Sequence, residues 1–62
     1  MNAKEIREFR KSIGWTQQQL ADALGVTNVS VHKWEKEIAR PHPVFDAKME
    51  EIRSMKLAEI HD

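Results

Sequence analysis

Four residues near the middle of the chain carry side chains suited to reading the edges of base pairs: Asn28, Val29, His32 and Lys33. The Asn28 amide can pair with adenine N6 and N7, and Lys33 can donate to guanine O6 or N7. Val29 offers an apolar contact to a thymine methyl group, and the His32 imidazole can donate or accept at a base edge. Simpler roles remain open, with Asn28 reinforcing a helix cap and Lys33, like Lys36, serving only as a solubilising charge.

A short helix ahead of these residues has clear start and stop signals. Thr16 and Gln19 have the Ser/Thr-x-x-Glu/Gln spacing of a capping box, which predicts a helix start. Leu20 and Leu24 follow with a spacing of one helical turn, so they share an apolar face. Gly25 comes next and can take the left-handed conformation that ends many helices.

The base-reading candidates fall on a second short helix. Thr27 can cap it, and Val31 and Trp34 are three residues apart, which places both on one inward face. The outward face then holds the four candidates named above. Two such helices joined by a tight turn, over about residues 16–36, form a helix-turn-helix, and its second helix commonly lies in the major groove of DNA.

Two further helices complete the predicted fold. The first runs from about Ala3 to Ile13, with Asn2 as its cap, and the last runs from about Pro43 to Ile60. The predicted fold class is all-α: a compact four-helix domain spanning residues 1–62, with a long C-terminal helix. The core candidates recur at helical spacing; they are Ile6, Phe9, Ile13, Phe45, Met49 and Ile52.

One ion pair can be predicted from helix geometry. At about 100° per residue, Arg10 lies roughly 40° from Ile6, and Glu35 lies roughly 40° from Val31, so both charges face inward. An unpaired buried charge is costly, which predicts that Arg10 and Glu35 pair and join the first helix to the third. The alternative is that both side chains extend along the surface to water.

The composition sets limits on the class of protein. Sixty-two residues without cysteine make one small domain with no disulfide and no cysteine-based zinc site. The three histidines, His32, His42 and His61, lack metal-ligand spacing, so we expect no metal, no cofactor and no enzymatic activity. No signal peptide or membrane-spanning run is evident, which predicts a cytoplasmic protein without a membrane partner.

The charges cancel overall but are unevenly distributed. Ten basic residues balance ten acidic ones, whereas a DNA-binding domain is often basic. Residues 1–15 have four basic and two acidic residues, and residues 43–62 have three basic and five acidic ones. The acidic excess therefore collects in the C-terminal tail, where it can lie away from a duplex.

Contacts to the phosphate backbone are expected beside the reading helix. The second helix presents free N–H groups and the positive end of its dipole at its start, where Thr16 and Gln17 lie. Further candidates are Thr27, Lys36 and Arg40. Lys4, Arg7 and Lys11 form an outer strip on the first helix, for which a solvated surface is the favoured interpretation.

The end of the last helix is expected to form a dimer contact. Met55, Leu57 and Ile60 extend its apolar character beyond what a small globule can cover, which favours packing against a second copy. The alternative is a frayed amphipathic end.

Together these residues resemble the Cro and lambdoid-repressor class of helix-turn-helix proteins, also called the XRE family. The similar stretch covers roughly Ile6 to Pro43. The matching positions are Arg10, Thr16, Gln17, Leu20, Ala21, Gly25, Val26, Val31, Trp34, Glu35 and Pro41. The resemblance implies close helix crossing at Ala21, a recurring Arg10–Glu35 pair, and a Gln17 that binds phosphate and supports the base-reading side chains.

Two departures from this family pattern affect the expected geometry. Family members commonly have glycine in a sharp turn where this chain has Glu37. Because a non-glycine residue is strained in a left-handed turn, we expect a loop of different shape. The family's usual fifth helix is replaced by one longer final helix, so its usual dimerisation route is not expected here.

The resulting hypothesis is a sequence-specific transcriptional regulator, a small phage or bacterial repressor. It would bind double-stranded DNA as a homodimer, at an inverted repeat with half-sites about one helical turn apart. One rival is an antitoxin-like or anti-repressor protein that binds a protein partner, favoured by the apolar end of the last helix and the zero net charge. A second rival is the DNA-binding module of a larger enzyme, against which the initial Met1 argues weakly.

Overall fold

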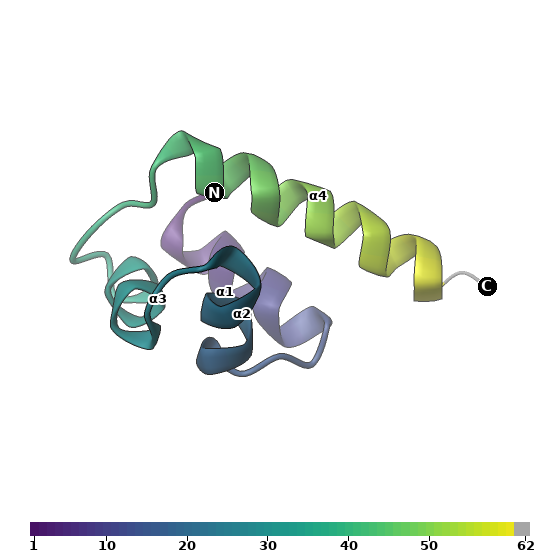
Figure 1. Cartoon of the computed structure of the whole chain (residues 1–62), viewed down its shortest axis with the longest axis horizontal. Coiled ribbons are helices and arrows are strands. Elements are labelled where there is room, and N and C mark those ends of the chain that lie inside the picture. Colours follow the sequence, from purple (N-terminus) through teal and green to yellow (C-terminus); the bar gives the residue numbers. More distant parts are fainter. Residues whose placement is uncertain (61–62) are drawn as a thin grey trace.

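Four helices make up the computed structural model, which describes residues 1–60 and the side chains of residues 1–56. They are α1 (Ala3–Ser12), α2 (Gln17–Leu24), α3 (Asn28–Glu35) and α4 (Pro43–Ile60). Figure 1 shows the three short helices gathered on one side of the long α4. The described part of the chain contains no strand. The fold is therefore all-α, as the sequence predicts.

The helix starts follow the predicted capping signals. The Asn2 side chain accepts a hydrogen bond from the Glu5 amide at 2.8 Å, and the Glu5 carboxylate accepts one from the Asn2 amide at 3.2 Å. Thr16 and Gln19 form the equivalent reciprocal pair at the start of α2. α1 ends at Ser12, one residue before its predicted end, and Ile13 is the capping residue.

The turn between α2 and α3 is tight, and two small residues, Gly25 in the turn and Ala21 in α2, permit it. Gly25 has a left-handed backbone with φ of +73°, which a residue without Cβ adopts at little cost. The Val26 amide donates to the Ala21 carbonyl at 3.0 Å, closing the end of α2. Ala21 is completely buried, as expected where α2 and α3 pack closely. This turn fixes the angle at which α3 leaves α2.

The core lies between the three short helices and the first half of α4. Trp34 of α3 contacts Phe45 of α4, with their ring centroids 5.7 Å apart. Burying these side chains is the main stabilising contribution in so small a protein. The buried apolar residues packed together are Ile6, Phe9, Leu20, Ala21, Leu24, Val31, Trp34 and Met49.

The first part of α4 packs on the core, and its later part contacts the connector between α1 and α2, where Lys56 Nζ lies 5.7 Å from the Trp15 ring centroid. Phe45, Met49 and Ile52 pack on the core, and the terminal ammonium of Met1 pairs with the Asp46 carboxylate at 2.8 Å. The end of α4 and the helix α3 lie toward opposite ends of the molecule's long axis (Figure 1). The helix α3 and the end of α4 are thus well separated in the molecule.

The loop after α3 differs from the expectation based on Glu37. That residue has a φ of +63°, in the left-handed region. The predicted change in loop shape is therefore wrong at this residue, which takes the left-handed turn without a glycine. Hydrogen bonds over the turn hold it there: the Glu37 amide donates to the Trp34 carbonyl at 3.3 Å, and the Ile38 amide to the Lys33 carbonyl at 2.9 Å.

Replacing Glu37 by glycine should stabilise the protein. A residue with a Cβ loses about 1 kcal/mol in the left-handed region, and glycine does not. For a domain of this size that gain corresponds to a Tm increase of about 4–8 °C. Thermal unfolding of Glu37→Gly measures it. Glu37→Ala removes the same charge but keeps the Cβ, so an equal gain in both variants would contradict a backbone origin.

Candidate nucleic-acid interface

The outer face of α3 presents the four base-reading candidates together. Asn28, Val29, His32 and Lys33 are all exposed, and Val29 has a relative accessibility of 60%. The inner face is buried, with Val31 completely covered. An exposed valine in the first turn of a helix buries little apolar surface, so it contributes little to the free energy of folding. The face therefore combines an amide, an apolar group, an imidazole and an ammonium on one rigid element.

The start of α2 provides donors for an anion next to this face. The amides of its first turn have no acceptor within the helix, and the Thr16 side chain satisfies only that of Gln19, at 3.1 Å. Thr16 is exposed, so its hydroxyl is accessible at the surface. Gln17 is half-buried, and its amide nitrogen donates to Glu35 Oε1 at 3.3 Å. This contact couples the start of α2 to the end of α3.

Arg10 and Glu35 form a two-pronged ion pair between α1 and α3. Arg10 Nε donates to Glu35 Oε2 at 2.7 Å, and Arg10 Nη2 donates to Glu35 Oε1 at 3.0 Å. The remaining Nη1 donates to the Trp15 carbonyl at 2.9 Å. The side chains are 14% and 4% exposed, so the pair is nearly dry. The structure thus contains the pair that the helix geometry predicts.

The environment of Glu35 favours its ionised form. Burial by itself raises the pKa of the Glu35 carboxyl. The hydrogen bonds from Arg10 and Gln17, together with the charges of Arg10 and Arg7, lower it by more, and the net pKa lies below the ordinary value of 4.5. The hydrogen bonds to Glu35 raise the pKa of Arg10 despite its partial burial. The pair is consequently charged at neutral pH.

Arg7 has a structural role that the sequence does not predict. Instead of lying on a solvated strip with Lys4 and Lys11, it contacts α3, where its Nη1 donates to the Glu35 backbone carbonyl at 2.6 Å. Carbonyls of the last helical turn lack partners within the helix, and a cation stabilises that end of the dipole. Arg7 is one turn before Arg10 on α1, and this spacing to an inward arginine was the available signal. Lys4 approaches only Glu8, at 4.0 Å.

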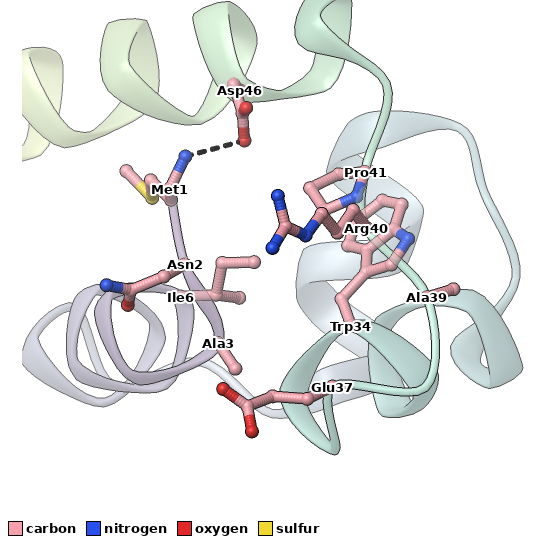
Figure 2. A pocket seen from close by; sticks show the side chains of 10 residues that line it. All are labelled: Met1, Asn2, Ala3, Ile6, Trp34, Glu37, Ala39, Arg40, Pro41 and Asp46. Atoms are coloured by element: carbon pink, nitrogen blue, oxygen red, sulfur yellow. Dashed lines mark ion pairs between the residues drawn. The ribbon is translucent and has the colours of Figure 1, made fainter.

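The other phosphate candidates occupy different surroundings. Thr27 is exposed, and its hydroxyl caps α3 by accepting from the Ser30 amide at 3.2 Å. Lys36 is exposed directly after α3. Arg40 is also exposed, but Figure 2 shows its guanidinium turned toward a cavity between the start of α1 and α4. The Arg40 side chain is therefore directed toward this cavity, unlike what is expected of a phosphate-binding residue.

The expected dimer residues fall only partly within the described side chains. Met55 has a relative accessibility of 58%, so it is an exposed apolar residue on α4. The side chains of Leu57 and Ile60 lie outside the described part of the structure.

Other kinds of site find no support in the described residues. No group of three His, Cys, Asp or Glu side chains among them is arranged to hold a metal ion. None of the helices in this part of the chain is long and apolar enough to cross a membrane.

Comparison with family models decides the classification. A model described as helix-turn-helix matches residues 6–44, which is more than half of the chain. The chain belongs to this helix-turn-helix family. It is the XRE, or Cro and lambdoid-repressor, class that the sequence resembles. No curated protein and no solved structure gives a match.

Family membership establishes a DNA-binding domain and leaves most of α4 unassigned. Proteins of this helix-turn-helix family are generally non-enzymatic DNA binders. The match begins at Ile6 in α1, includes α2 and α3, and ends at Val44 in the first turn of α4. The Arg10–Glu35 pair lies inside the matched region. The exposed Met55 lies outside it, so the family gives no role to that end of the helix.

Removing Arg10 should destabilise the helix-turn-helix domain strongly. In Arg10→Met, the buried Glu35 carboxylate loses two hydrogen bonds and its counter-ion, with an expected loss of about 3–5 kcal/mol in the free energy of unfolding. Urea unfolding at neutral pH measures this loss. Lys11→Met, at the neighbouring exposed position of α1, is the control and should change little. An unchanged Tm in Arg10→Met would rule out a stabilising role for the pair.

The same pair predicts a loss of stability in acid. Because the folded state lowers the pKa of Glu35 below 4.5, its stabilising effect is complete above that pH. It is lost as the pH falls through the lower folded-state pKa. Unfolding measured from neutral pH into this acid range should therefore show a steeper decline in the wild type than in Glu35→Gln. Glu8→Gln removes an exposed carboxylate and should keep the wild-type slope. Identical slopes for the wild type and Glu35→Gln would refute this assignment.

Proposed function

We propose that this protein is a sequence-specific transcriptional regulator that reads DNA with α3 in the major groove. Asn28, Val29, His32 and Lys33 contact base edges in this arrangement. The observation that carries the proposal is the contrast between the two faces of α3. Its inner face is fixed by buried contacts, while its outer face exposes a varied set of donors, acceptors and apolar groups. Such a set can distinguish base pairs, at about 1–3 kcal/mol for each good bidentate contact.

Phosphate contacts on both sides of the groove set the register of α3. Thr16 and the first amides of α2 bind one phosphate, and Gln17 joins them through an amide that also holds Glu35. Thr27 and Lys36 flank the two ends of α3. Arg40 reaches a phosphate only if its side chain turns out of the cavity seen in Figure 2. These contacts supply affinity for any sequence, while the base contacts supply specificity.

The small size of the DNA-binding domain favours a homodimer. One eight-residue helix reads few base pairs, so two copies on an inverted repeat supply the missing affinity and specificity. Met55, with Leu57 and Ile60, provides the apolar contact between the copies. Occupying the operator then excludes RNA polymerase from the promoter.

The shape of the molecule affects the half-site spacing. It measures 37 Å along its longest axis, and α3 and the end of α4 lie toward opposite ends of that axis (Figure 1). Two copies joined at their α4 ends hold their α3 helices farther apart than one turn of DNA. Half-sites about two turns apart fit this dimer better than the one-turn spacing expected from the sequence. Selecting binding sites from random duplexes returns this spacing directly.

A second candidate function is an antitoxin-like or anti-repressor role with a protein partner. The exposed Met55 and the zero net charge favour it. The salt dependence of the binding constant distinguishes the two functions, because DNA binding releases counterions from the duplex. A regulator that contacts several phosphates should show a plot of log K against log salt with a slope of several units. Binding that is absent or insensitive to salt would favour the protein partner.

Two substitutions should weaken DNA binding in different ways. Lys33→Ala should relax the preference at one base position, because it removes a base donor. Gln17→Ala should weaken binding to all duplexes alike, because it removes a contact to a DNA phosphate. Affinities for the selected site and its single-base variants measure both effects, with folding checked by thermal unfolding.

Lys48→Ala is the matched control for charge. Lys48 is an exposed lysine on α4, away from α3, and its loss should leave sequence preference unchanged. If Lys33→Ala and Gln17→Ala lower the affinity for every duplex equally, the assignment of Lys33 to a base is wrong.

A further inference from the structure

A cavity of about 610 Å³ lies between the start of α1, the loop after α3 and the first turns of α4. Its volume is in the range of small-molecule sites, about 300–1,000 Å³. Figure 2 shows Ile6 and Trp34 facing it from opposite sides. Ile6 is completely buried beneath the lining, whereas Trp34, at 6% relative accessibility, and the half-buried Met1 and Pro41 form the accessible apolar wall.

Arg40 brings an unpaired cation to this cavity. Figure 2 shows its guanidinium directed between Ile6 and Met1, and the side chain is exposed. Within the described residues it forms no hydrogen bond or ion pair. A guanidinium offers several N–H donors in a planar fork that matches a carboxylate. The cation can therefore bind a ligand without breaking an existing contact.

The acidic groups in the cavity do not cancel this cation. The Asp46 carboxylate is already paired with the Met1 ammonium at 2.8 Å. Figure 2 shows the Glu37 carboxylate on the far side of Ala3 from Arg40. The end of the cavity near Arg40 consequently carries a net positive charge. An apolar wall beside a single free guanidinium matches an anion attached to a compact apolar group.

We propose that this cavity binds a small organic carboxylate with an aromatic or branched aliphatic body. The carboxylate accepts two hydrogen bonds from Arg40, and the apolar body packs against Trp34 and Pro41. This site goes beyond the proposed DNA-reading role, because Asn28 and Lys33 are not among its lining residues. A bound ligand links α1, the loop after α3 and α4, and therefore stabilises the folded state by mass action.

Phenylacetate is a suitable probe, and phenylacetamide is its uncharged analogue of nearly the same shape. Titrated into the full chain, phenylacetate should raise the Tm and shift the NMR signals of the Trp34 indole N–H and the Arg40 side chain. The Trp15 indole, which is not part of the cavity lining, should not move. Phenylacetamide should bind at least about tenfold more weakly, because it cannot form the charged pair.

The variant Arg40→Gln tests the role of the guanidinium. It should weaken phenylacetate binding at least about tenfold, while Lys11→Gln, which removes an exposed charge outside the cavity, should not. Equal binding of the acid and the amide, or unchanged affinity in Arg40→Gln, would overturn the proposal. So would an Arg40→Gln variant that loses affinity for every duplex while phenylacetate fails to bind, since Arg40 would then be a DNA phosphate contact. Because the titration contains no DNA, its outcome is independent of the regulator hypothesis.

Discussion

The position of α3 depends on the contacts of Glu35 with the two preceding helices. Its carboxylate accepts hydrogen bonds from Arg10 of α1 and Gln17 of α2, and its backbone carbonyl accepts one from Arg7. Arg10 in turn holds the connector between α1 and α2 through the Trp15 carbonyl. A nearly dry, charged pair has a narrow range of acceptable geometry, because any displacement leaves a buried charge without its partner. The end of α3 is therefore fixed in direction as well as in place.

This constraint explains how so short a helix can be rigid. An isolated helix of eight residues is unstable in water. The inner face of α3 receives its stability from Val31, Trp34 and Glu35, all buried. The exposed residues of the outer face are not needed for this packing, so their types can vary without loss of stability.

Much of this arrangement could be predicted from local sequence signals. The capping pairs at Asn2 and Thr16 and the glycine at the turn act over three or four residues, so the sequence displays them directly. The Arg10–Glu35 pair was also predictable, because helical periodicity places both charges inward. Arg7 was not, since its acceptor is a backbone carbonyl twenty-eight positions away. Periodicity describes side-chain direction within a helix but not the carbonyls of another helix.

Two features depended on packing that no local pattern reports. Glu37 takes the left-handed turn because the flanking hydrogen bonds to Trp34 and Lys33 outweigh the strain of its Cβ. The direction of Arg40 depends on where α1 and α4 leave space, which is a property of the assembled helices. The sequence supports the four outward residues of α3 only as candidates, because exposure shows availability and does not identify the bases they contact.

The long α4 differs in its contacts along its length. Its first half is anchored by Phe45, Met49 and Ile52 and closes the core. Its later part carries the exposed Met55 beyond the region matched by the family model. The sequence of α4 contains four acidic and three basic residues, and the acidic side chains would be repelled by a duplex if α4 approached the phosphates. Charge and shape thus agree with the proposal that α3, and not the end of α4, faces the duplex.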